Sequence, residues 1–236
     1  MRKYFRFKQF SISDEKSAMK VGTDAVLLGA WADVSTTNNI LDVGTGSGII
    51  ATMLAQRSIA KIDAIDIDKG SIDDAQNNFH DCTWKNRLTA IHSSLLEYAK
   101  NTSKKYSLIV SNPPFFSNSM KSPMYSRSLS KHDEKLTHEE LLTGVKKLIN
   151  SNGRFNVILP FSQNTNFKKI ALVENLYCSK QLIIYPKHSK AANRIIMEFS
   201  RERQKNLSET KFTIRNTDNS FTKEYIGLTR DFYINF

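Results

Sequence analysis

Asn39-Ile-Leu-Asp-Val-Gly-Thr-Gly-Ser-Gly48 is the stretch that decides the fold. The apolar run at 39–43 predicts a buried strand, and the apolar spacing at 49–57 predicts a helix. The glycines between them permit backbone angles closed to other residues and let a ligand approach the main chain closely. Asp42 comes at the end of the strand, beside this turn. The G-x-G-x-G spacing differs from the dinucleotide fingerprint G-x-G-x-x-G, so a bound pyrophosphate is not implied.

Strands and helices alternate after this unit. Further strands are predicted near 61–67, 88–92, 106–111, 153–159, 180–185 and 194–200, and further helices near 70–80, 137–150 and 164–175. Such alternation is typical of an α/β fold with a parallel sheet covered by helices on both faces. No helix fits between the last two strands, so we expect them to form a hairpin and the last strand to run antiparallel.

The two ends of the chain carry weaker patterns. Residues 4–14 alternate aromatic and polar side chains, as a short hairpin or edge strand would. The segment 22–31 predicts a helix with Thr23 or Asp24 as its cap. Weak strand patterns at 212–215 and 225–228 have no assigned place in the fold. We expect one domain over 1–236, with an N-terminal extension at 1–36 and a C-terminal extension at 201–236.

Acidic residues end the strand at 61–67, about 20 residues after the glycines. A carboxylate at this point can accept hydrogen bonds from both hydroxyls of a ribose. Asp66 is the better candidate for this role. Asp68 could instead cap the helix that begins near Gly70.

Asn112-Pro113-Pro114-Phe115 follows the strand at 106–111. Open α/β folds hold their ligands at this carboxyl edge of the sheet. The Asn112 amide oxygen and the Pro113 carbonyl can accept hydrogen bonds, and Phe115 offers a flat apolar face. Together they suit a planar group with an NH2, such as adenine. A proline-rich turn that simply ends the strand is the alternative interpretation.

These ordered motifs resemble those of the S-adenosylmethionine-dependent amino-methyltransferases. Four longer stretches narrow the resemblance to the bacterial tRNA1(Val) adenine-37 N6-methyltransferases, and they lie at Phe5–Phe10, Met19–Trp31, Asn112–Pro123 and Asn193–Phe199. The resemblance covers roughly residues 4–200. It implies a Rossmann-like class I methyltransferase fold, with a seven-stranded, mostly parallel sheet and a reversed last strand. It also implies methyl transfer from S-adenosylmethionine to the N6 amine of adenine 37 in the anticodon loop of a tRNA.

The same resemblance implies roles for individual residues. Asn112, Pro113, Pro114 and Phe115 would form the catalytic motif, with Phe115 stacked on the target base. The cofactor would be held by residues of the glycine turn, by two strand ends and by the helix at 22–31, namely Asp42, Gly44, Gly46, Gly48, Asp66, Ile67, Ser94 and Asp24. Many relatives carry Asp where this chain has Ser94, whose hydroxyl can both donate and accept. For Asp24, a simple helix cap is the alternative.

The chain has a net charge of +11, from 34 Lys and Arg against 23 Asp and Glu. This excess favours a polyanionic partner such as nucleic acid. The long segment 116–136 interleaves basic and aromatic residues, as suits an RNA loop. The predicted RNA contacts in this segment and near the last hairpin are Lys121, Arg127, Lys131, His132, Lys187 and Arg194.

Composition also excludes several classes of protein. No run of about 18 apolar residues is present, so no membrane span is expected. Cys82 and Cys178 are far apart in sequence and favour a reducing, cytoplasmic setting. No histidine pair has metal-ligand spacing, so we expect no metal. Two alternatives stay open: the same motif acting on ribosomal RNA, DNA adenine or release-factor glutamine, and an inactive methyltransferase-like module that binds RNA.

Overall fold

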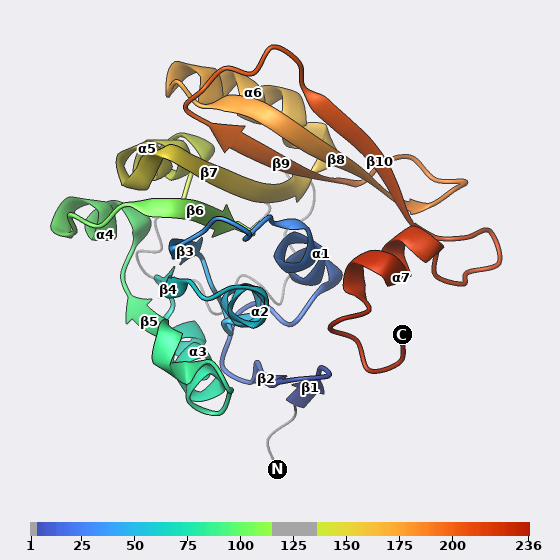
Figure 1. The fold of residues 1–236 in the computed structure, drawn as a ribbon, viewed down its shortest axis with the longest axis horizontal. Helices are drawn as coiled ribbons and strands as arrows, with labels where there is room; N and C mark the ends of the chain where they lie inside the picture. The colour runs from blue at the N-terminus through green and yellow to red at the C-terminus, as the bar shows by residue number, and fades with distance from the viewer. Residues whose placement is uncertain (1–3, 115–135) are drawn as a thin grey trace, which may run out of the picture.

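A computed structural model describes residues 4–114 and 136–236 of the chain. Its main sheet has the strand order β10-β8-β9-β7-β6-β3-β4-β5 (Figure 1). The strands are β3 (Asn39–Val43), β4 (Lys61–Asp66), β5 (Leu88–His92), β6 (Tyr106–Ser111), β7 (Ile149–Pro160), β8 (Tyr177–Lys187), β9 (Arg194–Ser200) and β10 (Ser208–Arg215). Neighbouring strands are parallel except at β9, which is antiparallel to both β7 and β8. The predicted sheet with one reversed strand is therefore confirmed.

The C-terminal segment adds an element that the sequence left unplaced. β10 contains the weak pattern at 212–215 and pairs in parallel with β8, so the seven predicted strands are extended to eight. The strand pattern at 225–228 was wrong, because these residues lie in the helix α7 (Lys223–Thr229). The Thr222 side chain caps this helix by accepting a hydrogen bond from the backbone nitrogen of Tyr225. A pattern of four residues is too short to distinguish a strand from a helix, whereas the Thr222 cap identifies the start of a helix.

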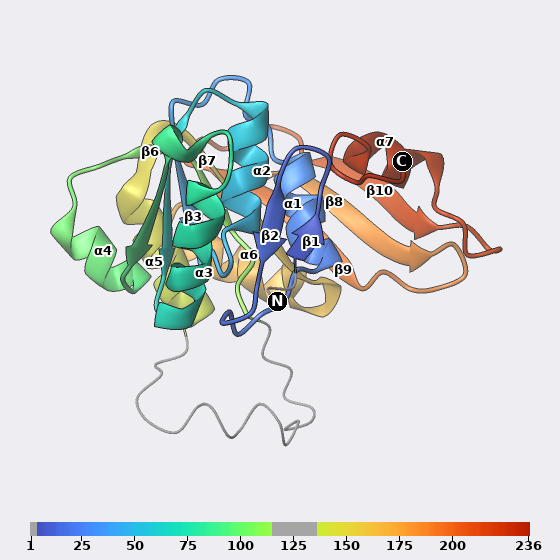
Figure 2. The ribbon, with the colours of Figure 1, turned by 90° about the horizontal axis from the view of Figure 1, so that it is seen from below.

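Helices cover both faces of the sheet (Figures 1 and 2). One face carries α1 (Thr23–Trp31), α2 (Ile49–Arg57), α3 (Lys69–His80) and α7, and the other carries α4 (Leu95–Asn101), α5 (His138–Leu148) and α6 (Asn164–Val173). Short 3-10 turns lie at Lys85–Arg87 and Phe161–Gln163. Each face has its own cluster of buried apolar side chains, so the sheet is the middle of three layers.

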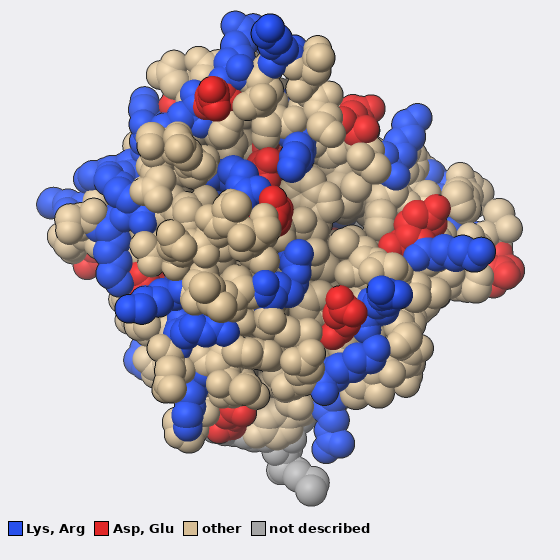
Figure 3. All heavy atoms as spheres, viewed as in Figure 1, with Lys and Arg blue, Asp and Glu red and all other residues tan. Residues whose placement is uncertain are grey.

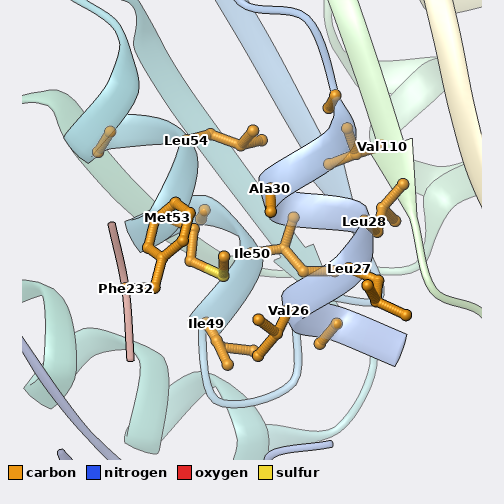
Figure 4. Packing of buried hydrophobic residues seen from close by; sticks show 14 of the residues in the cluster. Val26, Leu27, Leu28, Ala30, Ile49, Ile50, Met53, Leu54, Val110 and Phe232 are labelled. Atoms are coloured by element: carbon orange, nitrogen blue, oxygen red, sulfur yellow. The ribbon is translucent and has the colours of Figure 1, made fainter. Parts of the chain in front are cut away.

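The helices α1 and α2 pack closely on the sheet. A Cβ atom added to Gly29 would lie 2.9 Å from the sulfur of Met53, so a larger residue here would displace the Met53 side chain. Phe232, from the segment after α7, is 2% exposed and belongs to the same apolar cluster (Figure 4). The C-terminal segment therefore contributes to the apolar cluster that α1 and α2 share.

The N-terminal segment packs against the C-terminal one. β1 (Tyr4–Arg6) and β2 (Ser11–Ser13) form the predicted antiparallel hairpin. Between them, the backbone nitrogen of Lys8 donates to the carbonyl of Phe232 at 2.8 Å, and Lys8 Nζ donates to the carbonyl of Arg230 at 2.6 Å. The two ends of the chain thus brace one another on the α1 side of the sheet. Within 4–114 and 136–236, the helices are all too short or too polar to cross a membrane.

Candidate active site

Three adjacent strands bring the predicted site together at the carboxyl edge of the sheet. Val43 at the end of β3 lies opposite Ser111 on β6 and Ile65 on β4. The glycine turn after β3 is therefore flanked by Asn112, which follows β6, and by Asp66, which ends β4. This convergence was predicted from the order of the motifs along the chain.

The glycine turn has the left-handed backbone that its sequence predicts. The φ angles are 70° at Gly44, 57° at Gly46 and 82° at Gly48. A Cβ atom at Gly44 or Gly46 would meet nothing within 4 Å, whereas one at Gly48 would lie 2.5 Å from a ring carbon of Phe79. The first two glycines therefore leave main chain open to a ligand, and the third permits close packing of α3.

Asp42 supports this turn from inside the protein. One carboxylate oxygen accepts a hydrogen bond from the Thr45 hydroxyl at 2.6 Å and another from the backbone nitrogen of Ala51 at 3.2 Å. Its other oxygen is buried without a hydrogen-bond partner among the described residues. Burial raises the pKa of Asp42 to about 7, against the opposing effect of those two hydrogen bonds. The structure thus gives Asp42 a buried, turn-stabilising position.

Asp66 links the second strand end to the turn. One carboxylate oxygen accepts from the backbone nitrogen of Gly46 at 2.8 Å, and the other accepts from the backbone nitrogen of Asp68 at 2.9 Å. Burial raises the pKa of Asp66, and these two hydrogen bonds act in the opposite direction. Asp68 caps α3 through the backbone nitrogen of Ser71, as the sequence predicted. Asp66 is therefore held in place beside the open glycines.

Ile67 follows Asp66 at the end of β4, and Ser94 lies just beyond the end of β5. Ile67 is 51% exposed, so its apolar side chain is available to pack on a flat ligand. The Ser94 hydroxyl accepts from the backbone nitrogen of Glu97 at 3.2 Å and so caps α4. Sequence reasoning missed α4, although Ser94 and Glu97 have the spacing of a helix start. Ser94 therefore has a structural role in addition to any contact with a ligand.

Asn112 supplies an unused acceptor at the same edge. Its side-chain oxygen is buried and has no hydrogen-bond partner in the described part of the chain. The Ser111 hydroxyl donates to the Val43 carbonyl at 2.9 Å and fixes the end of β6 beside the glycine turn. Buried polar atoms almost always have a partner, so an unpaired oxygen here points to a donor that arrives with a ligand. Pro113 is buried and Pro114 is exposed, whereas Phe115 lies outside the described residues.

Asp24 and Arg194, predicted to contact cofactor and RNA respectively, form one ion pair. The Arg194 Nε donates to the Asp24 carboxylate at 2.8 Å. The predicted cap by Thr23 or Asp24 is wrong. Gly22 occupies the cap position of α1, so this helix begins without a side-chain cap. Asp24 is instead drawn to the guanidinium at the start of β9, a partner 170 residues away that no local pattern reveals.

The remaining predicted RNA contacts divide into two groups. Lys187, at the end of β8, donates from Nζ to the Asn219 side chain at 3.0 Å. The other four lie outside the described residues, and they are Lys121, Arg127, Lys131 and His132. No cluster of three or more potential metal ligands occurs in the described ranges 4–114 and 136–236.

Comparisons with known proteins agree with this geometry. The family model of the methyltransferase small domain matches residues 17–171. A curated relative from Bacteroides fragilis, named tRNA1(Val) (adenine(37)-N6)-methyltransferase, is 41% identical over 232 residues, which is 98% of each chain. Solved structures share the fold at lower identity. A predicted O-methyltransferase from Agrobacterium tumefaciens has a TM-score of 0.67 and 15% identity over 89% of this chain and 96% of its own.

A second solved structure shows the fold with ligands. The T. thermophilus 16S rRNA N2 G1207 methyltransferase, in complex with AdoMet and guanosine, has a TM-score of 0.59 and 16% identity, over 86% of this chain and 50% of its own. Both structural likenesses establish the fold alone, whereas the near-complete curated match and the family model establish membership. The chain therefore belongs to the methyltransferase small-domain family and, within it, to the tRNA1(Val) (adenine(37)-N6)-methyltransferases.

Proposed function

We propose that this protein transfers a methyl group from S-adenosylmethionine to the N6 amine of adenine 37 in the anticodon loop of tRNA1(Val). The observation that carries the proposal is the unpaired, buried oxygen of Asn112, placed beside the open glycine turn. The name of the relative from Bacteroides fragilis favours the tRNA substrate over ribosomal RNA, DNA adenine or release-factor glutamine. A tRNA substrate and two free cysteines both suit a cytoplasmic enzyme.

The residues around the turn fit the proposed cofactor. Gly44 and Gly46 leave the room that the methionine and ribose portions need, because a Cβ atom at either would point into open space. Asp66 would accept the ribose hydroxyls while its hydrogen bond to Gly46 keeps it oriented. Ile67 would pack against the adenine ring of the cofactor. When bound, S-adenosylmethionine supplies a methyl group already activated by a sulfonium charge.

Asn112 and Pro113 would prepare the acceptor amine. The lone pair of an arylamine nitrogen is delocalised into the ring, which makes it a weak nucleophile. Hydrogen bonds from the NH2 group to the Asn112 oxygen and the Pro113 carbonyl would favour a more tetrahedral nitrogen. They would also stabilise the positive charge that develops there as the N–C bond forms and the S–C bond of the donor breaks, which leaves the cofactor as the neutral thioether S-adenosylhomocysteine. The methylated cation is acidic and loses one N–H proton to water, so neutral acceptors suffice.

Moving the target base into the active site costs little free energy. An anticodon-loop adenine is already unpaired, so moving it into the site requires less free energy than extrusion from a duplex. The overall positive charge would attract the phosphates of the tRNA. A substrate in a loop therefore suits both the site and the surface.

Methyl transfer to tRNA1(Val) that lacks the modification tests the proposal. Radiolabelled S-adenosylmethionine, with ribosomal RNA, DNA and a release factor as competing acceptors, identifies the substrate. In Asn112→Ala we expect kcat to fall by about 10²- to 10³-fold, because one pre-organised acceptor is removed. Cofactor affinity, measured by calorimetry, is expected to stay unchanged. Full activity of Asn112→Ala would contradict the mechanism, and labelling of a different acceptor would contradict the substrate.

A further inference from the structure

A cavity of about 710 Å³ lies outside the glycine turn and the Asn112 motif. It is an open pocket lined by the N-terminal hairpin, the first turns of α1, the carboxyl ends of β8 and β10, the start of β9, and the C-terminal segment that includes α7. Of the residues predicted to hold the cofactor, Asp24 alone lines this cavity, and it is paired there with Arg194. The segments that line it come from both ends of the chain (Figure 1).

The cavity opens at the same sheet edge as the proposed active site. Arg194, which lines the cavity, lies opposite Pro160 near the end of β7. Ser111, which precedes the Asn112 motif, lies opposite Val157 of the same strand. Arg194 therefore lies two strand spacings, or about 10 Å, to the side of Ser111, and three residues further along the strand direction. A polynucleotide with its target base at Asn112 has neighbouring nucleotides within reach of this cavity.

Arginine and aromatic side chains line the cavity. The Arg215 guanidinium lies 4.0 Å from the centre of the Phe221 ring, in a stacked cation–π arrangement. Phe5 is 42% exposed, and the neighbouring Arg6 is exposed as well. Both residues belong to β1 and line the cavity. Rings and guanidinium planes of this kind stack on unpaired bases, and guanidinium groups bind phosphate.

Charge favours an anionic occupant. The lining contains three arginines, at positions 6, 194 and 215, and one acid, Asp24, which is already paired with Arg194. Over the whole face seen in Figure 3, Lys and Arg side chains are more widespread than Asp and Glu. A neutral or cationic ligand would gain nothing from this balance, whereas a phosphate between stacked bases would.

We propose that this cavity binds a nucleotide of the substrate tRNA other than the target adenine, with its base against Phe5 and its phosphate at Arg6 and Arg215. This assignment rests on the proposed function, because it presumes an RNA acceptor. It gives the two ends of the chain a shared role in substrate recognition. The cofactor does not take part in this contact.

Binding of an unmodified tRNA1(Val) transcript to single variants tests the assignment. Arg6→Ala removes an exposed charge that makes no hydrogen bond within 4–114 and 136–236. We expect it to weaken tRNA binding and to reduce the slope of log K against log salt by about 1. Arg203→Ala is the matched control, since Arg203 is an exposed arginine in the β9–β10 connection at the opposite edge of the sheet. That control is expected to bind tRNA like the unaltered protein.

Phe5 tests the stacking part of the assignment. Phe5→Ala is expected to weaken tRNA binding by roughly 5- to 150-fold, the range for loss of one base–aromatic stack. Because Phe5 also packs on Phe7 with ring centres 4.8 Å apart, Phe5→Leu serves as a second variant that keeps apolar bulk but loses the stacking face. Calorimetry with S-adenosylmethionine checks that each variant is folded.

The outcomes separate the two proposals. Equal tRNA affinity in Arg6→Ala, Phe5→Leu, Arg203→Ala and the unaltered protein would overturn the cavity assignment, while methylation of the tRNA by all four would leave the proposed function intact. An equal loss in Arg6→Ala and Arg203→Ala would also overturn it, because the effect would then be general charge. If the unaltered protein neither binds nor methylates the tRNA, the proposed function itself fails.

Discussion

The Asp66 carboxylate accepts a hydrogen bond from the backbone nitrogen of Gly46 at 2.8 Å, which ties the end of β4 to the turn after β3. The Asp66 side chain is therefore oriented before any ligand arrives. Pre-organisation of this kind lowers the cost of binding, because fewer groups must be ordered by the ligand. It also means that a change at residue 66 affects both the acceptor and the turn.

Asp66→Ala is predicted to weaken S-adenosylmethionine binding by roughly 10- to 100-fold, since hydrogen bonds to a charged group contribute about 1.5–3 kcal/mol. Calorimetry measures this loss directly. Asp73→Ala is the matched control, because Asp73 is an acid on α3 that pairs with Lys16 and Lys69 away from the turn. Equal cofactor affinity in both variants would show that Asp66 does not contact the cofactor.

Alanine substitutions at Gly46 and Gly48 are predicted to have different effects on cofactor binding and stability. Gly46→Ala places a methyl group in open space at φ 57°, so the cost in folding free energy is about 1–2 kcal/mol from backbone strain alone. Its main effect is a loss of cofactor affinity. A clash of about 1.4 kcal/mol between the added methyl group and the bound cofactor is enough for a tenfold loss.

Gly48→Ala adds a clash with Phe79 to the same kind of strain. We expect about 2–5 kcal/mol of lost stability, combining the two costs. Urea unfolding and calorimetry, applied to Gly46→Ala and Gly48→Ala together, separate the effects. A ranking in which Gly46→Ala is the less stable variant would contradict the assigned geometry.

Asp42 is predicted to make stability fall as pH rises. The folded-state pKa of about 7 lies above the unfolded value of about 3.9, so the folded state binds more protons between these values. Its contribution is fully present below pH 4 and is lost as pH rises towards 7, with an order of magnitude of roughly 4 kcal/mol.

Asp42→Asn removes this dependence. An amide keeps an oxygen for the Thr45 hydroxyl and carries no proton that titrates in this range. The variant is expected to show a flatter profile of unfolding free energy between pH 4 and 7 than the unaltered protein. Chemical denaturation at several pH values measures both curves, and parallel curves would show that Asp42 is not the responsible group.

Phe232→Ala is predicted to destabilise the whole protein by about 3–5 kcal/mol, because a fully buried aromatic ring is removed from the core. We propose that residues 1–236 fold as one cooperative domain, so a single unfolding transition should shift. Val173→Ala, at a side chain that is 77% exposed, is the control and should change stability little. A separate early transition confined to the C-terminal segment would contradict the single domain.

The sequence predicted the central elements because their signals were local. The apolar run before the glycines, the alternation at 61–67 and the Asn112 motif each identify a strand end, and parallel topology then places those ends together. Asp68 as a helix cap was also readable, since a cap acts within three residues.

What the sequence missed depends on partners distant in the chain. The pairing of Asp24 with Arg194 joins α1 to β9, and no pattern within either segment indicates it. β10 is mostly exposed and polar, with Phe212 as its one buried side chain, and its place in the sheet is set by backbone pairing with β8. The cavity between the chain ends likewise exists only after hairpin, α1 and α7 have packed.

The reversed direction of β9 has a consequence for how such enzymes diverge. Arg194, the first residue of β9, pairs with Pro160 at the end of β7 and with Ile184 near the end of β8, and Asn193 extends this pairing through hydrogen bonds with Ile184 and Phe161. The tip of the connection at 188–192 therefore projects from the reactive edge beyond the paired strands. Changes of length or side chain in that tip leave the hydrogen-bonded scaffold undisturbed. Preferences for new acceptors can therefore evolve in this connection, while the glycine turn and the Asn112 motif stay unchanged.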